Sequence, residues 1–341
     1  MRSHYLVCVP VLCIAAAGCN ETVSGVRDLD GGNAVRDLAA PGSTDAAAPA
    51  PDLAQGNHIQ NVFIILMENK QWSDVLGDTD APYINNTLLA IGAHAENYHQ
   101  PPGNHPSEPN YIWLEAGNNL GIADDNPPAN NHQATTEHLV TLLDRAGVSW
   151  KSYQEGIDGK SCPLADNGQT NYAVRHNPMV FFDDVTNKMD ASFQYCIDHV
   201  RPYSELATDL ASGHVARYNF ITPSLCHDMH GQGTGCLIPH IGDGDAWLQS
   251  EVPHILGSAV FKEAGALFLT WDECDQLELI KCDSPIGMIV VSPFAKAGYA
   301  GKVQYDHSST LRTVEEIFGL NTLLRGAQVA TDLRDLFTAF P

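Results

Sequence analysis

Short apolar runs alternate with amphipathic stretches along most of the chain after residue 58. The strongest run, VFIILM at residues 62–67, is apolar at every position, as expected of a strand buried on both faces. Four further segments predict strands: residues 148–153, 218–222, 266–270 and 288–291. The intervening segments predict helices at residues 136–146, 205–211, 246–263 (with a kink at Pro253) and 310–318. This alternation predicts an α/β fold with a mostly parallel central sheet and helices on both sides.

Polar side chains follow four of the predicted strands directly. They are Glu68 and Asn69, then His227, Asp228 and His230, then Asp272 and Glu273, and lastly Ser292. Ligands of open α/β sheets bind outside the carboxyl ends of the strands, so we expect these groups to meet at one edge. A surface loop explains any one of them, but it explains the whole set poorly.

Several acidic and amide oxygens at one edge would repel each other unless a cation lay between them. Oxygen ligands suit a hard or borderline divalent ion, and Ca²⁺, Mg²⁺, Mn²⁺ and Zn²⁺ all remain candidates. The alternative is that Asp272 and Glu273 cap a helix or pair with basic residues. The chain has only 18 Lys and Arg against 41 Asp and Glu, which weakens that alternative.

The segment His105-Pro106-Ser107-Glu108-Pro109 contains a candidate nucleophile. Its two prolines restrict the backbone on either side of Ser107. A serine held beside a metal ion can lose its proton and attack phosphorus. The alternative role is that of a turn serine that caps the following helix.

The first 57 residues predict an export signal followed by a flexible linker. Arg2 precedes an apolar run at residues 5–17, which is too short to span a bilayer, and Ala16-Ala17-Gly18 precede Cys19. Residues 1–18 therefore predict a lipoprotein signal peptide whose cleavage leaves an acylated Cys19; ordinary cleavage is the alternative. Residues 19–57 are rich in Ala, Pro and Asp and predict a flexible linker, and residues 58–341 predict one catalytic domain.

Six cysteines remain outside the signal region, and an even number in an exported domain favours three disulfides. Six cysteines allow 15 pairings. Local closure favours Cys162–Cys196, Cys226–Cys236 and Cys274–Cys282. A zinc–thiolate site is the alternative, but no two of these cysteines have the Cys-x-x-Cys spacing.

The formal charge of −23 excludes nucleic acid as a partner, because most of the surface would repel phosphates. An anionic substrate therefore needs one local site of positive charge, which a metal ion supplies most simply.

Nine motifs, which run in order over nearly the whole predicted domain, carry a family resemblance. They are MENKQW from Met67, HPSEPNY from His105, Tyr153 with Glu155, RHNP from Arg175, HDMHG from His227, GDAWL from Gly244, TWDECD from Thr270, VSPFAKAG from Val291 and DHSSTLRTVEEIFGL from Asp306. The chain resembles the bacterial phosphoesterase family of secreted acid phosphatases and phospholipases C. Its likeness is greatest to short exported phosphatases that act on phosphatidylinositol 3-phosphate. The relation of this family to the alkaline phosphatase superfamily implies a three-layer α/β/α sandwich.

The resemblance implies roles for twelve residues. Ser107 would be the nucleophile, and His176, His230 and His307 would surround the phosphoryl group. One divalent ion would be held by Glu68, Asn69, Asp272 and Glu273. Phosphate would also meet His105, Asn110, Arg175 and Asp228, and Arg175 stands where Lys is more usual. Histidines with a pKa near 6.5 would be protonated donors at mildly acidic pH, which predicts an acidic optimum.

The sequence thus predicts a monomeric, exported, metal-dependent acid phosphatase that acts on phosphate monoesters of small molecules or phosphoinositide head groups. A phospholipase C-type phosphodiesterase on the same scaffold is the first alternative, and phospholipases of this family tend to carry further C-terminal domains. A surface lipoprotein that binds without catalysis is the second. A serine esterase is disfavoured because the chain has no Gly-x-Ser-x-Gly motif.

Overall fold

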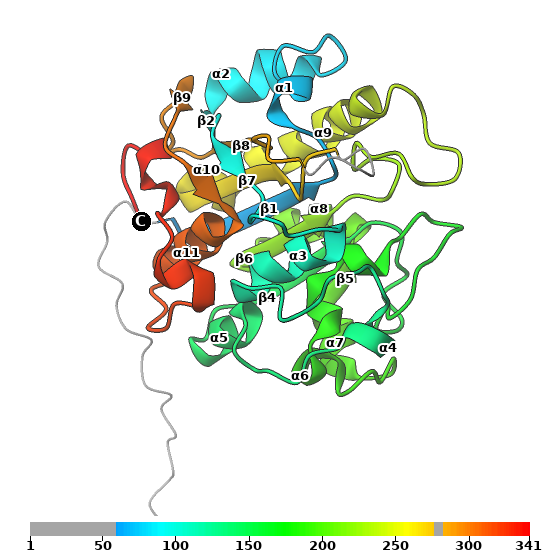
Figure 1. The fold of residues 1–341 in the computed structure, drawn as a ribbon. Coiled ribbons are helices and arrows are strands. Elements are labelled where there is room, and N and C mark those ends of the chain that lie inside the picture. Colours follow the sequence, from blue (N-terminus) through cyan, green and yellow to red (C-terminus); the bar gives the residue numbers. More distant parts are fainter. Residues whose placement is uncertain (1–58, 276–281) are drawn as a thin grey trace, which may run out of the picture. The chain divides into compact units, whose positions relative to one another are not determined.

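A computed structural model describes residues 59–275 and 282–341 of the chain. A sheet of eight strands in the order β5-β4-β6-β1-β7-β8-β2-β9 forms its centre (Figure 1). The strands, in that order, span Val200–Pro202, Trp150–Gln154, Tyr218–Thr222, Asn61–Met67, Gly265–Trp271, Met288–Val291, Ala93–Ala95 and Tyr299–Gly301. A separate pair joins β3 (Tyr98–His99) to β10 (Tyr305–Asp306).

Helices cover both faces of the sheet (Figure 1). One group packs together from α3 (Ser107–Ala116), α5 (Leu139–Arg145) and α11 (His307–Ile317). A second group consists of α8 (Leu206–Ser212), α9 (His240–Gly257) and α10 (Ala259–Ala264). Shorter helices are α1 (Trp72–Val75), α2 (Leu89–Ile91), α4 (Pro128–Asn131), α6 (Asp183–Thr186) and α7 (Gln194–His199). The predicted α/β fold with helices on both sides of a mostly parallel sheet is confirmed.

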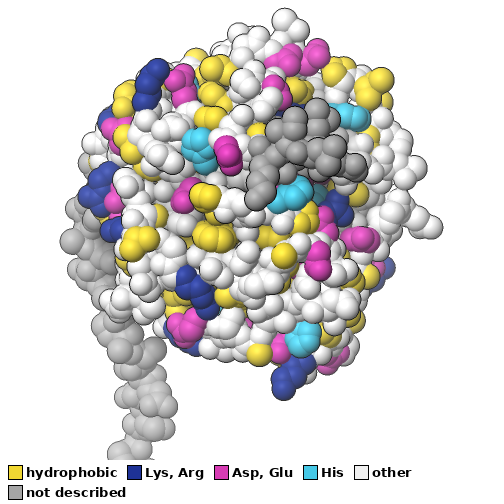
Figure 2. Space-filling model, in the orientation of Figure 1, with side chains coloured by type: hydrophobic (Ala, Val, Ile, Leu, Met, Phe, Trp, Pro, Cys, Tyr) yellow, Lys and Arg dark blue, Asp and Glu magenta, His cyan; other side chains and the backbone are white. Residues whose placement is uncertain are grey.

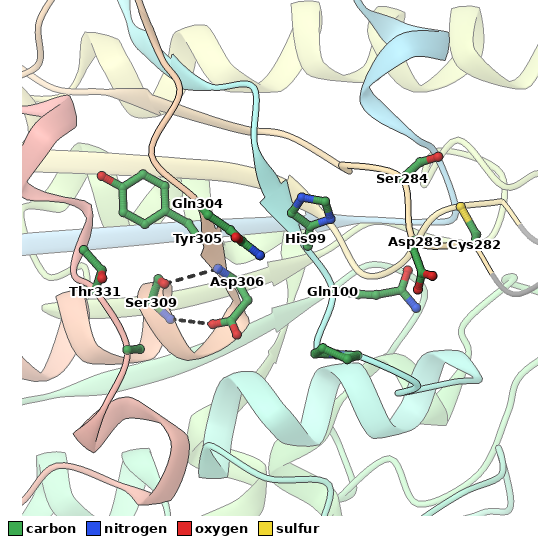
Figure 3. A pocket seen from close by; sticks show the side chains of 12 residues that line it. His99, Gln100, Cys282, Asp283, Ser284, Gln304, Tyr305, Asp306, Ser309 and Thr331 are labelled. Atoms are coloured by element: carbon green, nitrogen blue, oxygen red, sulfur yellow. Dashed lines mark hydrogen bonds between the residues drawn. The ribbon is translucent and has the colours of Figure 1, made fainter.

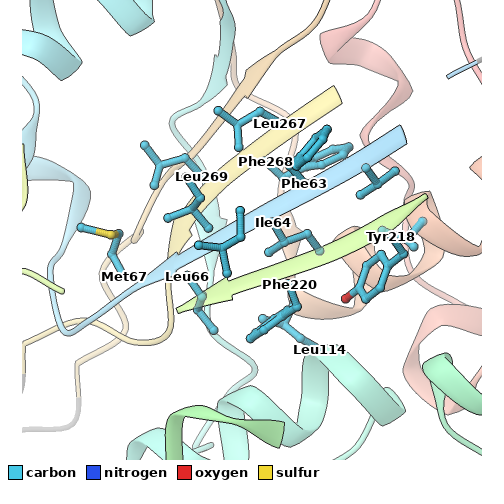
Figure 4. Packing of buried hydrophobic residues seen from close by; sticks show 14 of the residues in the cluster. Phe63, Ile64, Leu66, Met67, Leu114, Tyr218, Phe220, Leu267, Phe268 and Leu269 are labelled. Atoms are coloured by element: carbon cyan, nitrogen blue, oxygen red, sulfur yellow. The ribbon is translucent and has the colours of Figure 1, made fainter. Parts of the chain in front are cut away.

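The three central strands form the core of the sheet. β1 lies between β6 and β7 and is parallel to both. Phe63, Phe220 and Phe268 on these strands are fully buried, and Leu114 of α3 packs toward Phe220 (Figure 4). Strands covered on both faces need apolar side chains in both directions, which explains the continuous apolar run of β1.

The expected position of Ser292 at the functional edge is wrong. β8 runs antiparallel to β7, with Leu267 opposite Val291, so its carboxyl end points to the other edge of the sheet. There the Ser292 hydroxyl donates to the carbonyl oxygen of Gly265, at the beginning of β7 (2.7 Å). A four-residue apolar run carries no information on strand direction.

The predicted helix at residues 246–263 is two helices. α9 begins earlier, at His240, and continues past Pro253 to Gly257. Ser258 then caps α10 by accepting a hydrogen bond from the Phe261 N–H. The chain therefore changes direction at a capping serine and not at the proline. Helix α11 likewise begins at His307, earlier than expected, because Asp306 and Ser309 form a capping box.

The three predicted disulfides are present: Cys162–Cys196, Cys226–Cys236 and Cys274–Cys282. The predicted signal peptide, the linker and Cys19 lie outside the described residues. Within the described ranges, no helix has the length and apolar character needed to cross a bilayer. On the face shown in Figure 2, Lys and Arg side chains lie in small separate groups among acidic ones.

Candidate active site

The loops that follow β1, β6 and β7 meet at one edge of the sheet, as the strand pattern predicts. The Glu68 N–H donates to the Asp228 carbonyl oxygen (2.7 Å), which joins the loop after β1 to the loop after β6. The Asp272 N–H donates to the Met67 carbonyl oxygen (3.0 Å), which joins the loop after β7 to the end of β1. Because these strands are parallel and adjacent, residues far apart in sequence become neighbours here.

Ser107 is the first residue of α3, and its side chain points to the acidic cluster instead of capping the helix. Its hydroxyl donates to Glu68 Oε2 at 2.9 Å, and both residues are buried. One turn further along α3, the Tyr111 hydroxyl donates to the other carboxylate oxygen of Glu68 at 2.5 Å. A single helix thus presents two hydroxyl groups to one buried carboxylate.

Asn69 connects the two acidic residues that follow β7. Its N–H donates to Asp272 Oδ1 (3.0 Å), and its side-chain amide donates to Glu273 Oε1 (3.1 Å). The second oxygen of Glu273 lies 2.7 Å from His105 Nδ1 and 3.3 Å from Asn110 Nδ2. Asn69 adopts a φ of +40°, a left-handed conformation in which Asn is one of the favoured residues.

The three predicted histidines approach the carboxylates from different sides. His176 Nε2 lies 3.2 Å from Glu68 Oε1, and its ring stacks on Tyr111 at 5.0 Å between centroids. His230 Nδ1 lies 3.9 Å from Glu68 Oε2. His307 Nε2 lies 2.6 Å from the carbonyl oxygen of Asp272, so this histidine supports the acidic loop from behind.

A cavity of about 180 Å³ opens over Ser107. Six of its lining residues were predicted to act in the site: Asn69, His105, Ser107, Arg175, His230 and Glu273. The other predicted residues, which do not line the cavity, lie in the shell around it: Glu68, Asn110, His176, Asp228, Asp272 and His307 are all buried.

Sequence reasoning missed four residues that belong to the site. Asp125, Gln232 and Asp275 line the cavity, and Tyr111 contacts Glu68. Arg175 lies between two of them, with Nε 3.7 Å from Asp125 and Nη2 donating to Gln232 at 3.1 Å. Tyr111 was detectable, because it lies in the HPSEPNY motif one helical turn after Ser107. Asp125 and Gln232 lie in loops with no pattern of their own.

Burial dominates the electrostatics of the carboxylates. It raises the pKa of Glu68 well above the usual range, and the nearby charge of Asp272 raises it further. Burial raises the pKa of Asp272 to about 7 and that of Asp228 to about 7. It raises the pKa of Glu273 to about 10, with Asp272 again adding to the shift. Without positive charge at their centre, these groups favour their protonated forms.

The same burial acts on the histidines in the opposite direction. It lowers the pKa of His230 to about 4 and that of His307 to about 4, and it holds the pKa of His176 well below its usual value. Burial therefore favours the neutral form of all three rings. The structure differs here from the expectation of protonated histidines, because desolvation disfavours the charged imidazolium.

The donor atoms fit a divalent ion when amide and hydroxyl oxygens are counted with the carboxylates. Asn69 Oδ1, Asp228 Oδ2 and Asp272 Oδ2 are buried and accept no hydrogen bond among the described residues. Unsatisfied oxygens of this kind are costly unless a ligand or cation is bound. In the described part of the chain, no three His, Cys, Asp or Glu side chains form a metal-binding group by themselves. Asn69 and Ser107 offer further oxygen atoms beside these carboxylates.

Comparisons with known proteins agree with this architecture. The probable acid phosphatase of Kluyveromyces lactis is 27% identical over 294 residues, covering 84% of this chain and 64% of that protein. The acid phosphatase of Aspergillus fumigatus is 25% identical over 276 residues, which are 80% of this chain and 57% of that protein. The phosphatidylinositol-3-phosphatase of Mycobacterium tuberculosis is 28% identical over 261 residues, which cover 76% of this chain and 77% of that protein. The chain thus spans about three fifths of the length of the first two relatives.

Solved structures share the fold, and one of them is a protein of the alkaline phosphatase superfamily. A member from Vibrio parahaemolyticus has a TM-score of 0.54 at 11% identity and covers 83% of this chain and 72% of its own. The phosphonate monoester hydrolase of Silicibacter pomeroyi has a TM-score of 0.51 at 12% identity, and the match covers 83% of this chain and 77% of that protein. The model of the Phosphoesterase family matches residues 80–321, most of the described structure. This chain belongs to the Phosphoesterase family.

Proposed function

We propose that this protein is a metal-dependent hydrolase of phosphate monoesters with Ser107 as its nucleophile. The observation that carries the proposal is the 2.9 Å hydrogen bond from Ser107 Oγ to Glu68, inside a cluster of buried acidic residues. A serine placed only to cap a helix would have no reason to face buried carboxylates. The acid phosphatases among its relatives support phosphate esters as substrates.

The ion would be held by Glu68, Asn69, Ser107 and Asp272, with Glu273 as a further predicted ligand. When bound, it would lower the pKa of the serine hydroxyl and neutralise charge on the phosphoryl group. Glu273 shares its two oxygens among Asn69, His105 and Asn110, so it also orients the groups around the ion.

The residues of the chain supply the remaining steps. As Ser107 Oγ attacks phosphorus, its proton passes to Glu68 Oε2, the acceptor of its hydrogen bond, and the ester oxygen leaves as the alkoxide. Arg175 in the cavity stabilises the charged phosphoryl oxygens. His105 Nδ1 is engaged by Glu273, so its Nε2 is the group that can deliver a proton to the departing alkoxide. Water then cleaves the phosphoserine, which restores Ser107 and releases phosphate.

A monoester suits this cavity better than a diester. A volume of about 180 Å³ accommodates a terminal phosphoryl group and leaves little room for a second substituent on phosphorus. A phospholipase C-type phosphodiesterase remains the second candidate. Phosphatidylinositol 3-phosphate is a candidate substrate because one relative carries that activity in its name.

Hydrolysis of p-nitrophenyl phosphate by the purified, metal-reconstituted protein tests the proposal. Ser107→Ala should lower kcat by about 10⁴-fold or more. Ser250→Ala, at an exposed position of α9, should leave kcat unchanged. Faster hydrolysis of bis-p-nitrophenyl phosphate would favour the phosphodiesterase. No activity on either ester, or full activity of Ser107→Ala, would refute the assignment.

We also propose export and anchoring of the chain through an acylated Cys19. The three disulfides support export, because such bonds persist in oxidising compartments. Labelled palmitate fed to expressing cells should appear in the wild-type protein and be absent from Cys19→Ala. Export without label would indicate ordinary signal cleavage.

A further inference from the structure

Arg175 is the only Lys or Arg among the described residues that line the catalytic cavity. The larger pocket of about 700 Å³ beside the β3–β10 strand pair shares no lining residue with that cavity, so its side chains lie outside the phosphoryl site (Figure 3). Three carboxylates line the same cavity as Arg175: Asp125, Glu273 and Asp275. Apart from the proposed ion, the binding of an anionic phosphoryl group therefore depends on where this guanidinium points.

We propose that Gln232 is a positioning residue that aims Arg175 at the phosphoryl group. The inference rests on the proposed phosphatase function and assigns a further residue to it. The side-chain amide of Gln232 accepts a hydrogen bond from Arg175 Nη2 through its oxygen, at 3.1 Å. The amide nitrogen of Gln232 lies 3.1 Å from His230 Nε2. One amide group therefore joins two side chains of the cavity that were predicted to meet the phosphoryl group.

Hydrogen-bond chemistry fixes the orientation of this amide. A guanidinium has only donors, so the amide oxygen must face Arg175 and the amide nitrogen must face His230. Because the amide nitrogen can only donate, the neutral ring of His230 accepts at Nε2 and carries its proton on Nδ1. That Nδ1 lies 3.9 Å from Glu68 Oε2. Gln232 thus also sets the tautomer of His230.

Asp125 holds a different nitrogen of the same guanidinium. Its Oδ2 lies 3.7 Å from Arg175 Nε, and its Oδ1 accepts the N–H of Glu108, the residue after Ser107, at 2.9 Å. Carboxylates form strong two-point pairs with arginine, so without a second partner the guanidinium would turn onto Asp125. Gln232 opposes that turn. Because an amide is uncharged, it leaves the positive charge of Arg175 available to phosphate.

These two contacts leave part of the guanidinium open. Arg175 makes no other hydrogen bond among the described residues. A guanidinium has more N–H groups than these contacts use, so donors remain on both terminal nitrogens for phosphoryl oxygens. The planar fork of arginine, unlike a lysine ammonium, can be held at one nitrogen while another faces the substrate.

The backbone that carries Gln232 is fixed beside the segment that carries Arg175. The Thr234 N–H donates to Asn171 Oδ1 at 2.9 Å, and Asn171 Nδ2 donates to the Thr234 carbonyl oxygen at 3.2 Å. The Cys226–Cys236 disulfide closes the same loop. The side chain of Gln232 is exposed, so it fills no part of the core. Its contacts therefore serve to orient its neighbours and not to pack the fold.

Gln232→Met removes both hydrogen bonds and keeps the length of the side chain. In the metal-reconstituted protein it should raise KM for p-nitrophenyl phosphate and Kd for inorganic phosphate by about tenfold each, which corresponds to about 1.4 kcal/mol. It should leave kcat unchanged, because Arg175 holds the phosphoryl group in the ground state and in the transition state. It should also leave the urea unfolding midpoint unchanged. Gln194→Met, at an exposed position of α7, should alter none of these quantities.

A double-mutant cycle separates positioning from direct contact with the substrate. In an Arg175→Met background, Gln232→Met should change the Kd for inorganic phosphate by less than about twofold, because no guanidinium is left to aim. An effect of about tenfold that persists without Arg175 would mean that Gln232 binds phosphate itself or only supports its loop. That result would overturn the proposal.

Nitrogen-15 NMR of the histidine rings tests the second contact of the amide. In the wild-type protein the neutral ring of His230 should carry its proton on Nδ1, and the loss of its signals in His230→Ala identifies them. Gln232→Met should increase the share of the other tautomer. A wild-type ring with its proton on Nε2 would overturn the contact with Gln232.

The phosphate titration separates this inference from the proposed function. If no ester is hydrolysed, the phosphatase fails, but weaker binding of inorganic phosphate by Gln232→Met still supports the positioning role. If esters are hydrolysed and Gln232→Met binds phosphate as tightly as the wild type, the positioning role is overturned and the phosphatase stands. Absence of phosphate binding by the wild type also overturns the positioning role.

Discussion

The two ends of helix α3 each bring a buried glutamate together with a histidine, but the two clusters are built differently. At the beginning of the helix, Ser107 and Tyr111 face Glu68, and His176 lies 3.2 Å from that carboxylate. Near its end, Glu115 accepts from His138 Nδ1 at 2.9 Å. Both glutamates are almost completely buried.

The difference lies in the histidine nitrogens, because Glu115 Oε2 also has no hydrogen-bond partner among the described residues. Both ring nitrogens of His138 are engaged: Nδ1 by Glu115, and Nε2 by Asp184 at 3.0 Å. Its ring also stacks on Phe182 with 3.8 Å between centroids. In the other cluster, the contacting nitrogens of His176 and His230 form no hydrogen bond.

The pKa shifts follow the same division. Burial alone would lower the pKa of His138, but hydrogen bonds to Asp184 and Glu115 outweigh it and raise that pKa. Burial without such partners lowers the pKa of His176 and His230. We therefore expect the Glu115 cluster, whose histidine is fully hydrogen-bonded, to stabilise the fold, and the Glu68 cluster, whose contacting histidine nitrogens are open, to bind a ligand.

Glu→Gln substitutions, one in each cluster, should give the largest difference in activity between the two clusters. Glu68→Gln should lower kcat/KM by about a thousandfold, because it removes the charge that faces Ser107. Glu115→Gln should leave kcat/KM of the folded protein within about twofold, because Glu115 lies at the far end of α3. Steady-state kinetics with p-nitrophenyl phosphate measures both, and a comparable loss in the two variants would contradict the distinction.

His138→Gln should show the reverse pattern. Removing one member of a buried charged cluster should lower the free energy of unfolding by about 3 kcal/mol. The kcat/KM of the remaining folded protein should be unchanged. Urea unfolding of the oxidised protein measures the first quantity. A loss of activity without a loss of stability would mean that this cluster belongs to the catalytic machinery.

Metal removal should affect only the cluster at the beginning of α3. A chelator should abolish activity, and a divalent ion at a hundred times its Kd should restore it and add about 2.7 kcal/mol to the free energy of unfolding. Asp272→Asn should lose this metal-dependent stabilisation, and Glu115→Gln should keep it. Equal stabilisation of both variants by the ion would place its site elsewhere.

The pH dependence of stability should also distinguish the two clusters, and we expect this effect to be the smallest. The pKa of His138 is raised in the folded protein, so its contribution is complete below its unfolded pKa of about 6.5 and is lost as the pH rises through the folded value. The difference in unfolding free energy between wild type and His138→Gln should therefore shrink between pH 6 and pH 8. A difference that grows with pH would contradict the assignment.

The parts of the fold that could be predicted are those with local signals. The apolar run of β1 and the glycine that ends α8 are visible in the sequence, and Gly213 indeed adopts a left-handed conformation there. The direction of β8 was not predictable, because antiparallel and parallel pairing require the same apolar residues. Ser292 was therefore assigned to the wrong edge.

Prediction of the candidate site from the sequence was likewise limited to residues with local signals. The grouping of Glu68 and Asp272 could be expected, because both follow central strands of a parallel sheet. The positions of Asp125 and Gln232 on either side of Arg175 could not, because they depend on loop paths. The lowered pKa values of the histidines could not be anticipated either, because they depend on burial, and burial is a property of the packed molecule.

By itself, the sequence determined the α/β architecture, the order of the central motifs and the residue types at the carboxyl edge of the sheet. These follow from hydrophobic periodicity and from side chains adjacent to strands, which act over a few residues. Only the tertiary structure decided that Ser107 faces Glu68 and that His307 supports the acidic loop from behind. Distances and desolvation between segments far apart in sequence arise only when the helices close over the sheet.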